Sequence, residues 1–425
     1  MSTVLEKDKA LLIEGPASVV LQEGRVTALG ARLPLGKAVV IRKGKALPLV
    51  AEEEAHLRVN ASSGHVPLVL DGSTIPESWW KAINQIEAEN VPSVMVFGAS
   101  DCGKNTFCIA LANKLAKGNV KIAIIDGDVG QSDIGPPAAV SFSIVRKPIF
   151  DLFDLKPRSA VFVGRTSPSG VSSRVLAALA SLNDEVKGEA VSHLIVNTDG
   201  WVSDESAVDF KVRMVDIISP QVVVGIQRDA ELEPILSTLE GKGNKILRVE
   251  APGVVCHRNR EIRRELREQC FRKFLVEASV RTIPLGWLRL EQTFLNQVEA
   301  DAALRNSVSK LLDSPVVRCV ATEQGVRVVV PRDSKVDKAS ILKTEMALKM
   351  PVRVVFEGEE KGLIVALLDK DGKFGALGAV HSINFQNGII KVYTPYHRIP
   401  SIIQFSTIRL NESGRESENT EDFEP

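Results

Sequence analysis

The chain has 425 residues, 44% of them hydrophobic, and its 53 basic residues balance 53 acidic ones to a formal net charge of zero. This length allows two or three domains with a sizeable core. The zero net charge excludes a general attraction to nucleic acid, so any such contact needs a local basic patch. No apolar run approaches a membrane span, and the N-terminus lacks a signal-peptide core.

The cysteines are odd in number and fit no paired zinc spacing; they are Cys102, Cys108, Cys256, Cys270 and Cys319. Reduced thiols in a cytosolic compartment are the simplest explanation. We therefore expect a soluble, cytoplasmic protein without a membrane partner, or a nuclear one if the source is eukaryotic.

Residues 1–72 predict an N-terminal all-β domain. Short apolar runs at 11–13, 18–21, 26–29 and 38–41 alternate with glycine and proline turns. A helix is expected after residue 73, with a capping hydroxyl and an early proline. Its Trp79 and Trp80 could stack on a nucleobase, but packing against a domain is the favoured interpretation.

Residues 73–283 predict an α/β domain with a central P-loop NTPase-type parallel sheet. Its strands are continuous apolar runs, as expected for a parallel sheet buried on both faces, whose ligands sit at the carboxyl ends of the strands. The expected strands are 94–97, 121–125, 160–164, 191–197, 221–226 and 245–249, and the expected helices are 104–117, 171–182, 204–218 and 231–240.

An arginine-rich helical stretch at 252–282 ends this domain. A C-terminal, mostly-β domain is expected at 284–410, with strands near 315–320, 326–330, 352–356 and 363–368. The acidic segment 411–425 has little apolar content and is expected to be disordered.

A glycine-rich turn connects the first strand and the first helix of the α/β domain. It reads Gly98-Ala99-Ser100-Asp101-Cys102-Gly103-Lys104-Asn105-Thr106, which has the form G-x-x-x-x-G-K. Backbone N–H groups of such a turn favour an anion, and the lysine would reach the outer phosphates. A plain glycine turn with a surface lysine is the alternative, but the flanking strand and helix favour an ATP site.

Asn105 stands where a P-loop usually has a serine or threonine whose hydroxyl binds Mg²⁺. An amide oxygen can also serve a hard cation, although it is larger and must point correctly. ATP binding therefore follows more directly from the sequence than fast turnover does.

Two acids and a glutamine follow the second strand, in the run Asp126-Gly127-Asp128-Val129-Gly130-Gln131. A carboxylate at this strand end would bind Mg²⁺, and Asp128 could also accept a proton from an attacking hydroxyl that Gln131 orients. Acids that merely terminate a strand are the alternative.

The run Asn197-Thr198-Asp199-Gly200-Trp201 follows a later strand, and five arginines lie between Arg258 and Arg267. Trp201 could stack on a base or fold back onto its own domain, and spacing alone does not decide between these. The arginines could form a solvated helix with Glu–Arg pairs, or a lid that brings positive charge onto a transferring phosphoryl group.

These four stretches, in this order, resemble the polynucleotide 5′-hydroxyl kinases, which phosphorylate the 5′ end of RNA or DNA. The resemblance also covers a P-loop domain between two β domains, and it is clearest over roughly 90–275. It implies that Lys104 contacts the ATP phosphates, that Asn105 and Asp128 lie at Mg²⁺, and that Arg258 and Arg263 are lid arginines. Substrate contacts are implied at Gln131, Thr166, Thr198 and Trp201.

The leading hypothesis is thus an ATP- and Mg²⁺-dependent kinase acting on 5′-hydroxyl ends of RNA, or also of DNA. The alternative is an ATP-holding scaffold within an RNA-processing assembly of several proteins, which Asn105 favours. A P-loop ATPase or GTPase of the partitioning or metallochaperone type is a third hypothesis, but it gives no reason for the Asn-Thr-x-Gly-Trp run or the arginines.

Overall fold

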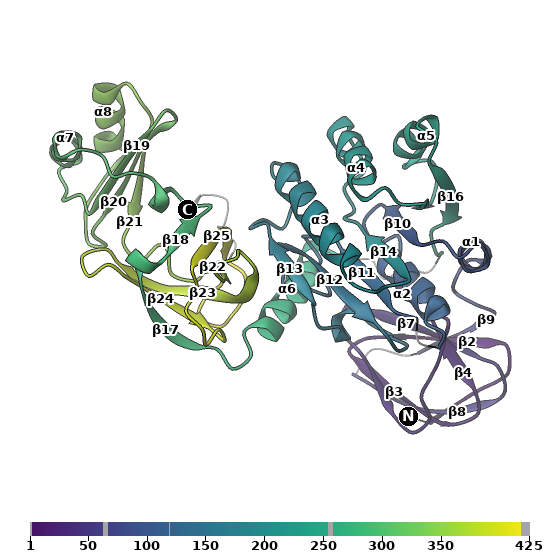
Figure 1. Ribbon diagram of the computed structural model, residues 1–425. Coiled ribbons are helices and arrows are strands. Elements are labelled where there is room, and N and C mark those ends of the chain that lie inside the picture. The colour runs from purple at the N-terminus through teal and green to yellow at the C-terminus, as the bar shows by residue number, and fades with distance from the viewer. Residues whose placement is uncertain (1, 63–66, 119, 254–257, 418–425) are drawn as a thin grey trace. The chain divides into compact units, whose positions relative to one another are not determined.

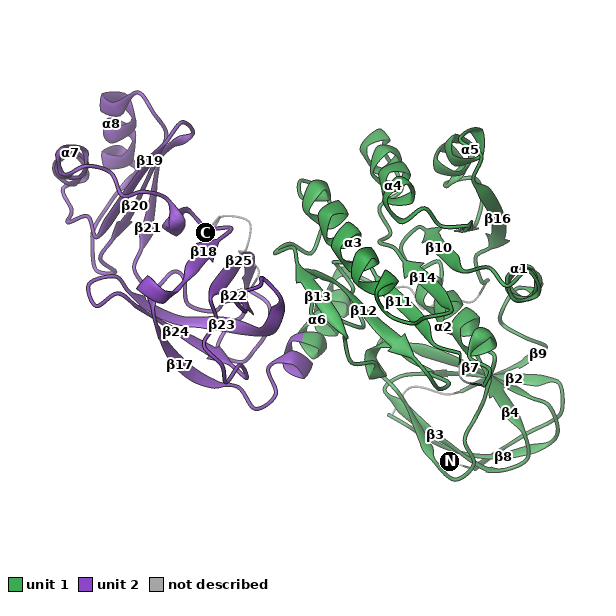
Figure 2. Cartoon of the chain, in the orientation of Figure 1, with its two compact units in different colours: residues 1–270 green, residues 271–425 purple. Residues whose placement is uncertain are grey.

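The protein folds into two compact units, residues 1–270 and 271–425 (Figure 2). The computed structural model describes residues 2–62, 67–118, 120–253 and 258–417. Each sheet within these described ranges takes its strands from one unit only, so each unit has its own β scaffold (Figure 1).

The first unit begins with two antiparallel sheets. One sheet has the order β1 (Ser2–Leu5), β8 (Ala55–Ala61), β3 (Ala17–Glu23), β6 (Ala38–Ile41). The other has the order β5 (Ala31–Arg32), β4 (Val26–Ala28), β7 (Ala46–Ala51), β2 (Lys9–Glu14), β9 (Leu68–Asp71). The strands expected from the four short apolar runs are confirmed, since β2, β3, β4 and β6 fall on them.

The centre of the first unit is a seven-stranded sheet. Its order is β13 (Ser159–Phe162), β12 (Ala139–Val145), β11 (Ile122–Asp126), β14 (His193–Asn197), β10 (Ser93–Gly98), β15 (Val222–Gln227), β16 (Lys245–Glu250). The six predicted strands are confirmed. The expectation of a wholly parallel sheet is wrong at one edge, because β12 pairs antiparallel with both β11 and β13. Ser141 and Ser143 interrupt the apolar run of β12, although both are buried, so its sequence did not indicate a strand.

Helices cover both faces of this sheet (Figure 1). Alternate residues of β10 point to opposite faces: Val94 and Val96 share a core with the N-terminal sheets, and Met95 and Phe97 share a second core. The first core includes α1 (Glu77–Ala88) and α2 (Lys104–Leu115), and the second includes α3 (Ser172–Lys187), α4 (Glu205–Ile218) and α5 (Glu233–Gly241). Trp79 of α1 is fully buried against Phe107, which confirms the packing interpretation.

The second unit contains a six-stranded and a three-stranded sheet. The chain enters it through α6 (Arg260–Phe274). The larger sheet has the order β17 (Ser279–Pro284), β24 (Ile389–Thr394), β23 (Phe374–Asn384), β22 (Leu363–Leu368), β25 (Ile402–Arg409), β18 (Arg289–Glu291). The smaller one is β19 (Arg318–Thr322), β20 (Gly325–Val330), β21 (Val352–Phe356), with α7 (Ala302–Leu312) and α8 (Lys338–Leu348) beside it.

Two further expectations concern the chain end and the cysteines. Residues 411–417 form a turn in which the Asn411 side chain accepts the N–H groups of Ser413 and Arg415, in contrast to the expected disorder. The remainder of that tail, 418–425, lies outside the described residues. The four described cysteines, Cys102, Cys108, Cys270 and Cys319, are buried and form no disulfide, and Cys256 is not among the described residues.

Candidate active site

The glycine-rich turn has the geometry of a phosphate loop. It leaves β10 at Gly98, and α2 begins at Lys104. Gly103 has a φ of +98°, and a Cβ atom there would lie 2.9 Å from the Trp79 ring. Both conditions require glycine, because other residues rarely adopt this backbone and would collide with the tryptophan. The turn therefore leads directly into the N-terminus of α2, where backbone N–H groups favour an anion.

Lys104 is 6% exposed and folds back over the loop. Its Nζ atom donates to the carbonyl oxygens of Gly98, at 2.9 Å, and Ala99, at 2.8 Å. These acceptors are neutral. A phosphate oxygen carries charge and makes a stronger hydrogen bond with an ammonium group, so a bound triphosphate would compete for this side chain.

Asp126 ends β11 beside the loop and is fully buried. Its carboxylate accepts the backbone N–H of Asp133 at 2.8 Å and the Asn197 amide at 3.0 Å. Burial, together with the charges of Asp128 and Asp133, raises the pKa of Asp126 to about 6. A divalent cation would relieve this repulsion among three carboxylates, so the donor set fits Mg²⁺.

Asp128 is half-buried and faces the same pocket as Lys104. Its Oδ1 atom accepts the N–H groups of Gly130 and Gln131, both at 3.0 Å. Burial raises the pKa of Asp128, while the charge of Lys104 acts in the opposite direction. The carboxylate is thus held in place beside the phosphate loop by its own backbone.

Asn105 lies at the start of α2 between two further polar groups. Its Nδ2 atom donates to Asp133 Oδ2 at 2.6 Å, and its Oδ1 atom accepts from Asn197 Nδ2 at 3.1 Å. Among the residues that the structure describes, no three His, Cys, Asp or Glu side chains form a metal-binding group. Mg²⁺ bound with a nucleotide commonly takes only one or two protein ligands, which Asn105 and Asp128 could supply.

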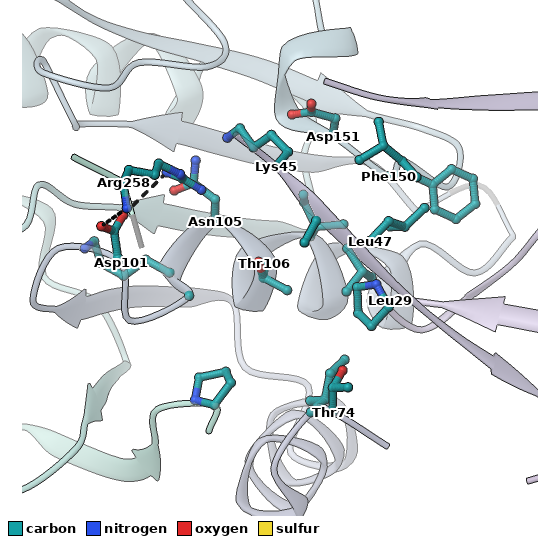
Figure 3. A pocket seen from close by; sticks show the side chains of 18 of the residues that line it. Leu29, Lys45, Leu47, Thr74, Asp101, Asn105, Thr106, Phe150, Asp151 and Arg258 are labelled. Atoms are coloured by element: carbon teal, nitrogen blue, oxygen red, sulfur yellow. Dashed lines mark hydrogen bonds and ion pairs between the residues drawn. The ribbon is translucent and has the colours of Figure 1, made fainter. Parts of the chain in front are cut away.

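The arginines expected in a lid reach the phosphate loop. The backbone N–H of Arg258 and the Nη2 atom of Arg263 donate to Asp101 Oδ2, at 3.2 and 2.8 Å. Figure 3 shows Arg258 beside Asp101 at the wall of the pocket. Arg258 also donates through Nε to the carbonyl of Gly44, and Gln131 donates to the carbonyl of Arg263. The segment that carries Arg258 and Arg263 is therefore attached to the loop by a carboxylate that belongs to the loop itself.

The predicted site residues divide into two groups. Lys104, Asn105, Asp128, Gln131, Arg258 and Arg263 line one pocket together with Ser100, Asp101, Gly103 and Thr106. Thr166, Thr198 and Trp201 do not line it, and neither do Gly98, Ala99 and Cys102 of the predicted phosphate loop. The Thr198 hydroxyl is buried and donates to Val96, and the Thr166 carbonyl lies where a Cβ on Gly130 would be only 2.7 Å away. Their roles in binding a substrate stay predictions.

Trp201 lies close to the phosphate loop without lining its pocket. Gly200 contacts Ser100, since a Cβ on it would be 2.5 Å from the serine oxygen. The indole packs against Phe210 at 5.7 Å and donates to Asp204 at 2.6 Å, yet the side chain remains partly exposed. One part of the ring is thus packed on its own unit, as one interpretation expected, and a part faces solvent, as stacking requires.

The N-terminal sheets contribute to the site, which the sequence did not indicate. Apolar side chains including Leu29 and Leu47 form one wall of the pocket (Figure 3). Lys45 and Asp151 also line it. Arg42 and Lys45, in the turn between β6 and β7, form ion pairs with Asp133. The residues that meet here are about 90 positions apart, so local patterns could not connect them.

Comparison with known proteins agrees with this geometry. Residues 98–277 match the family "mRNA cleavage and polyadenylation factor CLP1 P-loop". Two relatives named polyribonucleotide 5′-hydroxyl-kinase, from Pyrococcus furiosus and Methanocaldococcus jannaschii, are each 28% identical, covering 80% of this chain and 94% of theirs. A CLP1 homologue of Nematostella vectensis is 26% identical over 66% of this chain and 70% of its own.

A solved structure shares the fold. It is a complex of Clp1p with Pcf11p, which matches with a TM-score of 0.68 at 12% identity, covering 96% of this chain and 97% of that one. Within the described ranges, no helix is both long and apolar enough to cross a membrane. Over the phosphate loop and the arginine segment this chain is similar to the CLP1 P-loop family, and over most of its length it is similar to proteins named polyribonucleotide 5′-hydroxyl-kinase.

Proposed function

We propose that this protein transfers the γ-phosphoryl group of ATP to the 5′-hydroxyl end of RNA. The observation that carries the proposal is that Lys104, Asp128, Arg258 and Arg263, which come from three distant parts of the sequence, line one pocket around a phosphate loop. The names of the archaeal relatives, which specify polyribonucleotides, support RNA over DNA as the acceptor.

The reaction needs positioning and charge neutralisation more than covalent chemistry by the protein. The loop N–H groups and Lys104 would bind the ATP phosphates, and the apolar wall near Leu29 and Leu47 would receive the base. Asp128 would accept the proton of the attacking hydroxyl, and the raised pKa of Asp128 suits that task. Arg258 and Arg263 would neutralise charge on the phosphoryl group.

Mg²⁺, when bound, would neutralise charge on the β- and γ-phosphates, and we propose Asn105 and Asp128 as its protein ligands. The four described cysteines are thiols rather than disulfides, which supports a reducing, intracellular compartment, and we propose the cytoplasm.

The test is phosphoryl transfer from γ-labelled ATP to an RNA oligonucleotide. The acceptors are a 5′-hydroxyl RNA, the same RNA with a 5′-phosphate, and the matching DNA. We expect label only on 5′-hydroxyl ends, with RNA preferred. Lys104→Met should reduce the rate on the order of 10³-fold, the range for removing one donor to a developing charge. Absence of transfer by a protein that still binds ATP would refute the proposal.

A second candidate, an ATP-holding scaffold, is favoured by one observation: Asn105 occupies the position of the usual hydroxyl ligand. Asn105→Thr separates the two. A loss of activity would mean that the Asn105 amide is a working ligand, whereas a large gain would mean that the natural residue serves nucleotide retention.

A further inference from the structure

The amide of Asn105 has two chemically different ends, and its neighbours fix which way it points. Asp133 accepts from Nδ2 at 2.6 Å, and a carboxylate can only accept. On the other side, Asn197 Nδ2 donates both to Asn105 Oδ1 at 3.1 Å and to Asp126 at 3.0 Å. Turning either amide around would place an amide oxygen against a carboxylate. The order of donors and acceptors from Asp133 to Asp126 is therefore set in one direction.

Two cations next to the N-terminal sheets hold Asp133 in this position. Its side chain is 7% exposed, and Arg42 Nη2 and Lys45 Nζ lie 2.8 and 2.5 Å from its two oxygens. Arg42 is itself held by Asp151 at 2.7 Å and lies over the Phe153 ring.

These contacts direct the Asn105 oxygen away from Asp133 and toward Asn197 and Asp126. A serine or threonine hydroxyl could rotate to meet a cation, but an amide has a fixed oxygen end that must be oriented. An orienting partner outside the ligand set is a common requirement of metal sites.

We propose that Asp133 is a positioning residue, which orients the Asn105 amide so that its oxygen faces nucleotide-bound Mg²⁺. Asn105 and Asp133 together then replace the single serine or threonine hydroxyl of other phosphate loops. Arg42 and Lys45 connect Asp133 to the N-terminal sheets through ion pairs. The packing of those sheets on the α/β layers therefore affects the affinity for Mg²⁺–nucleotide. The inference rests on the proposed use of ATP with Mg²⁺.

The experiment is a double-mutant cycle on nucleotide binding, which needs neither RNA nor catalysis. Calorimetry gives the Kd of a non-hydrolysable ATP analogue with Mg²⁺ and with EDTA, and the ratio of the two is the Mg²⁺ effect. In Asp133→Asn, the new amide can offer either end to Asn105, so we expect the Mg²⁺ effect to fall at least tenfold while the EDTA value changes less than threefold.

The decisive comparison repeats Asp133→Asn in an Asn105→Thr background. A hydroxyl needs no orientation, so Asp133→Asn should change the Mg²⁺ effect less than threefold there. Any general loosening of the fold is present in both backgrounds and cancels in the cycle. An equal loss in both backgrounds would overturn the proposal.

Because Asp133→Asn leaves the largely buried cations of Arg42 and Lys45 with less negative charge around them, it could unfold the protein. The double variant Asn105→Asp with Asp133→Asn keeps the total charge of the two positions. It also keeps the hydrogen bond between them, but the side chain at position 133 is now the donor. It should keep a Mg²⁺ effect within threefold of the parent, and loss of the effect in this folded variant would overturn the proposal. A parent whose nucleotide binding ignores Mg²⁺ would refute the cofactor assignment as well, whereas a parent and Asp133→Asn with equal, large Mg²⁺ effects would refute only this inference.

Discussion

Two loops at the ends of neighbouring strands each hold a buried lysine, but they hold it differently. The loop after β10 contains Lys104, whose ammonium group donates to two backbone carbonyls. The loop after β14 receives Lys211 from α4, whose ammonium donates to the Asp199 carboxylate at 2.7 Å and to its carbonyl at 3.0 Å. Lys211 is completely buried.

The difference separates a residue available to a ligand from one that builds the site. Neutral carbonyls give up an ammonium to a phosphate, whereas a buried carboxylate does not, because separating the pair would leave two uncompensated charges. Burial lowers the pKa of Lys211, and Asp199 acts against this change. Asp199 also accepts the Trp201 N–H at 2.9 Å, so the pair fixes the backbone of the loop that carries Trp201.

The largest effect should therefore come from Lys211→Met. It leaves Asp199 buried without its cation, and we expect a loss of about 3–5 kcal/mol in the free energy of unfolding. Lys104→Met, the matched substitution, should cost about 1 kcal/mol, because only hydrogen bonds to carbonyls are lost. Urea unfolding of both variants tests this. Adding Asp199→Asn to Lys211→Met should recover most of the stability, and equal losses in the two single variants would end the distinction.

Sequence patterns predicted the residues that line the pocket better than they predicted the buried groups that support it. Lys104, Asp128 and the arginines lie in short motifs whose spacing carries a known chemistry, and they do line one pocket. Lys211 lies in an amphipathic helix without any such motif, and only the fold brings it beneath Asp199. Arg42, Lys45 and Asp133 meet for the same reason.

A second effect should appear at Trp201, on the outer side of the same loop. Trp201→Ala should weaken RNA binding by about 1–3 kcal/mol if the exposed part of the ring stacks on a base. The affinity for ATP should stay constant, because Trp201 does not line the pocket. Fluorescence anisotropy with labelled RNA measures the first quantity and calorimetry the second.

Trp287→Ala is the matched control, since this exposed tryptophan lies in the other unit. If both variants bind RNA like the parent, Trp201 serves only to pack on Phe210.

An intermediate effect is expected at Asp101, on the phosphate loop. Asp101→Asn removes the charged partner of Arg263 and Arg258, and a hydrogen bond to a charged group contributes about 1.5–3 kcal/mol. Hydrogen exchange of amides 258–264 should then accelerate by about tenfold to a hundredfold, because each 1.4 kcal/mol corresponds to a factor of ten. Glu265 lies on the same helix and forms a more exposed ion pair with Lys43, so Glu265→Gln should change exchange little. Unchanged exchange in Asp101→Asn would show that this carboxylate does not hold the lid.

The smallest effect should come from the surface cluster of Arg248, Glu233 and Glu240. Its contribution to stability is the value with which that of the buried Lys211–Asp199 pair can be compared. Arg248 donates to Glu233 and Glu240, with the closest contacts at 2.9 and 2.6 Å. The hydrogen bond from Arg248, and then that from Gln227, lowers the pKa of Glu233 to about 2. A depressed pKa means that this carboxylate stabilises the fold above its ordinary pKa of 4.5, and that this contribution is lost as the pH falls toward 2.

About a third of each side chain is exposed, so solvent screening limits the contribution to below about 1 kcal/mol. Glu233→Gln should therefore lower the free energy of unfolding by less than this amount at pH 7, and the difference from the parent should shrink as the pH is lowered from 5 toward 2. Urea unfolding at several pH values measures it, and 1 M salt at pH 7 should reduce the same difference. A difference that ignores both pH and salt would mean that Glu233 acts through packing, and the surface cluster would then no longer serve as an electrostatic reference for Lys211 and Asp199.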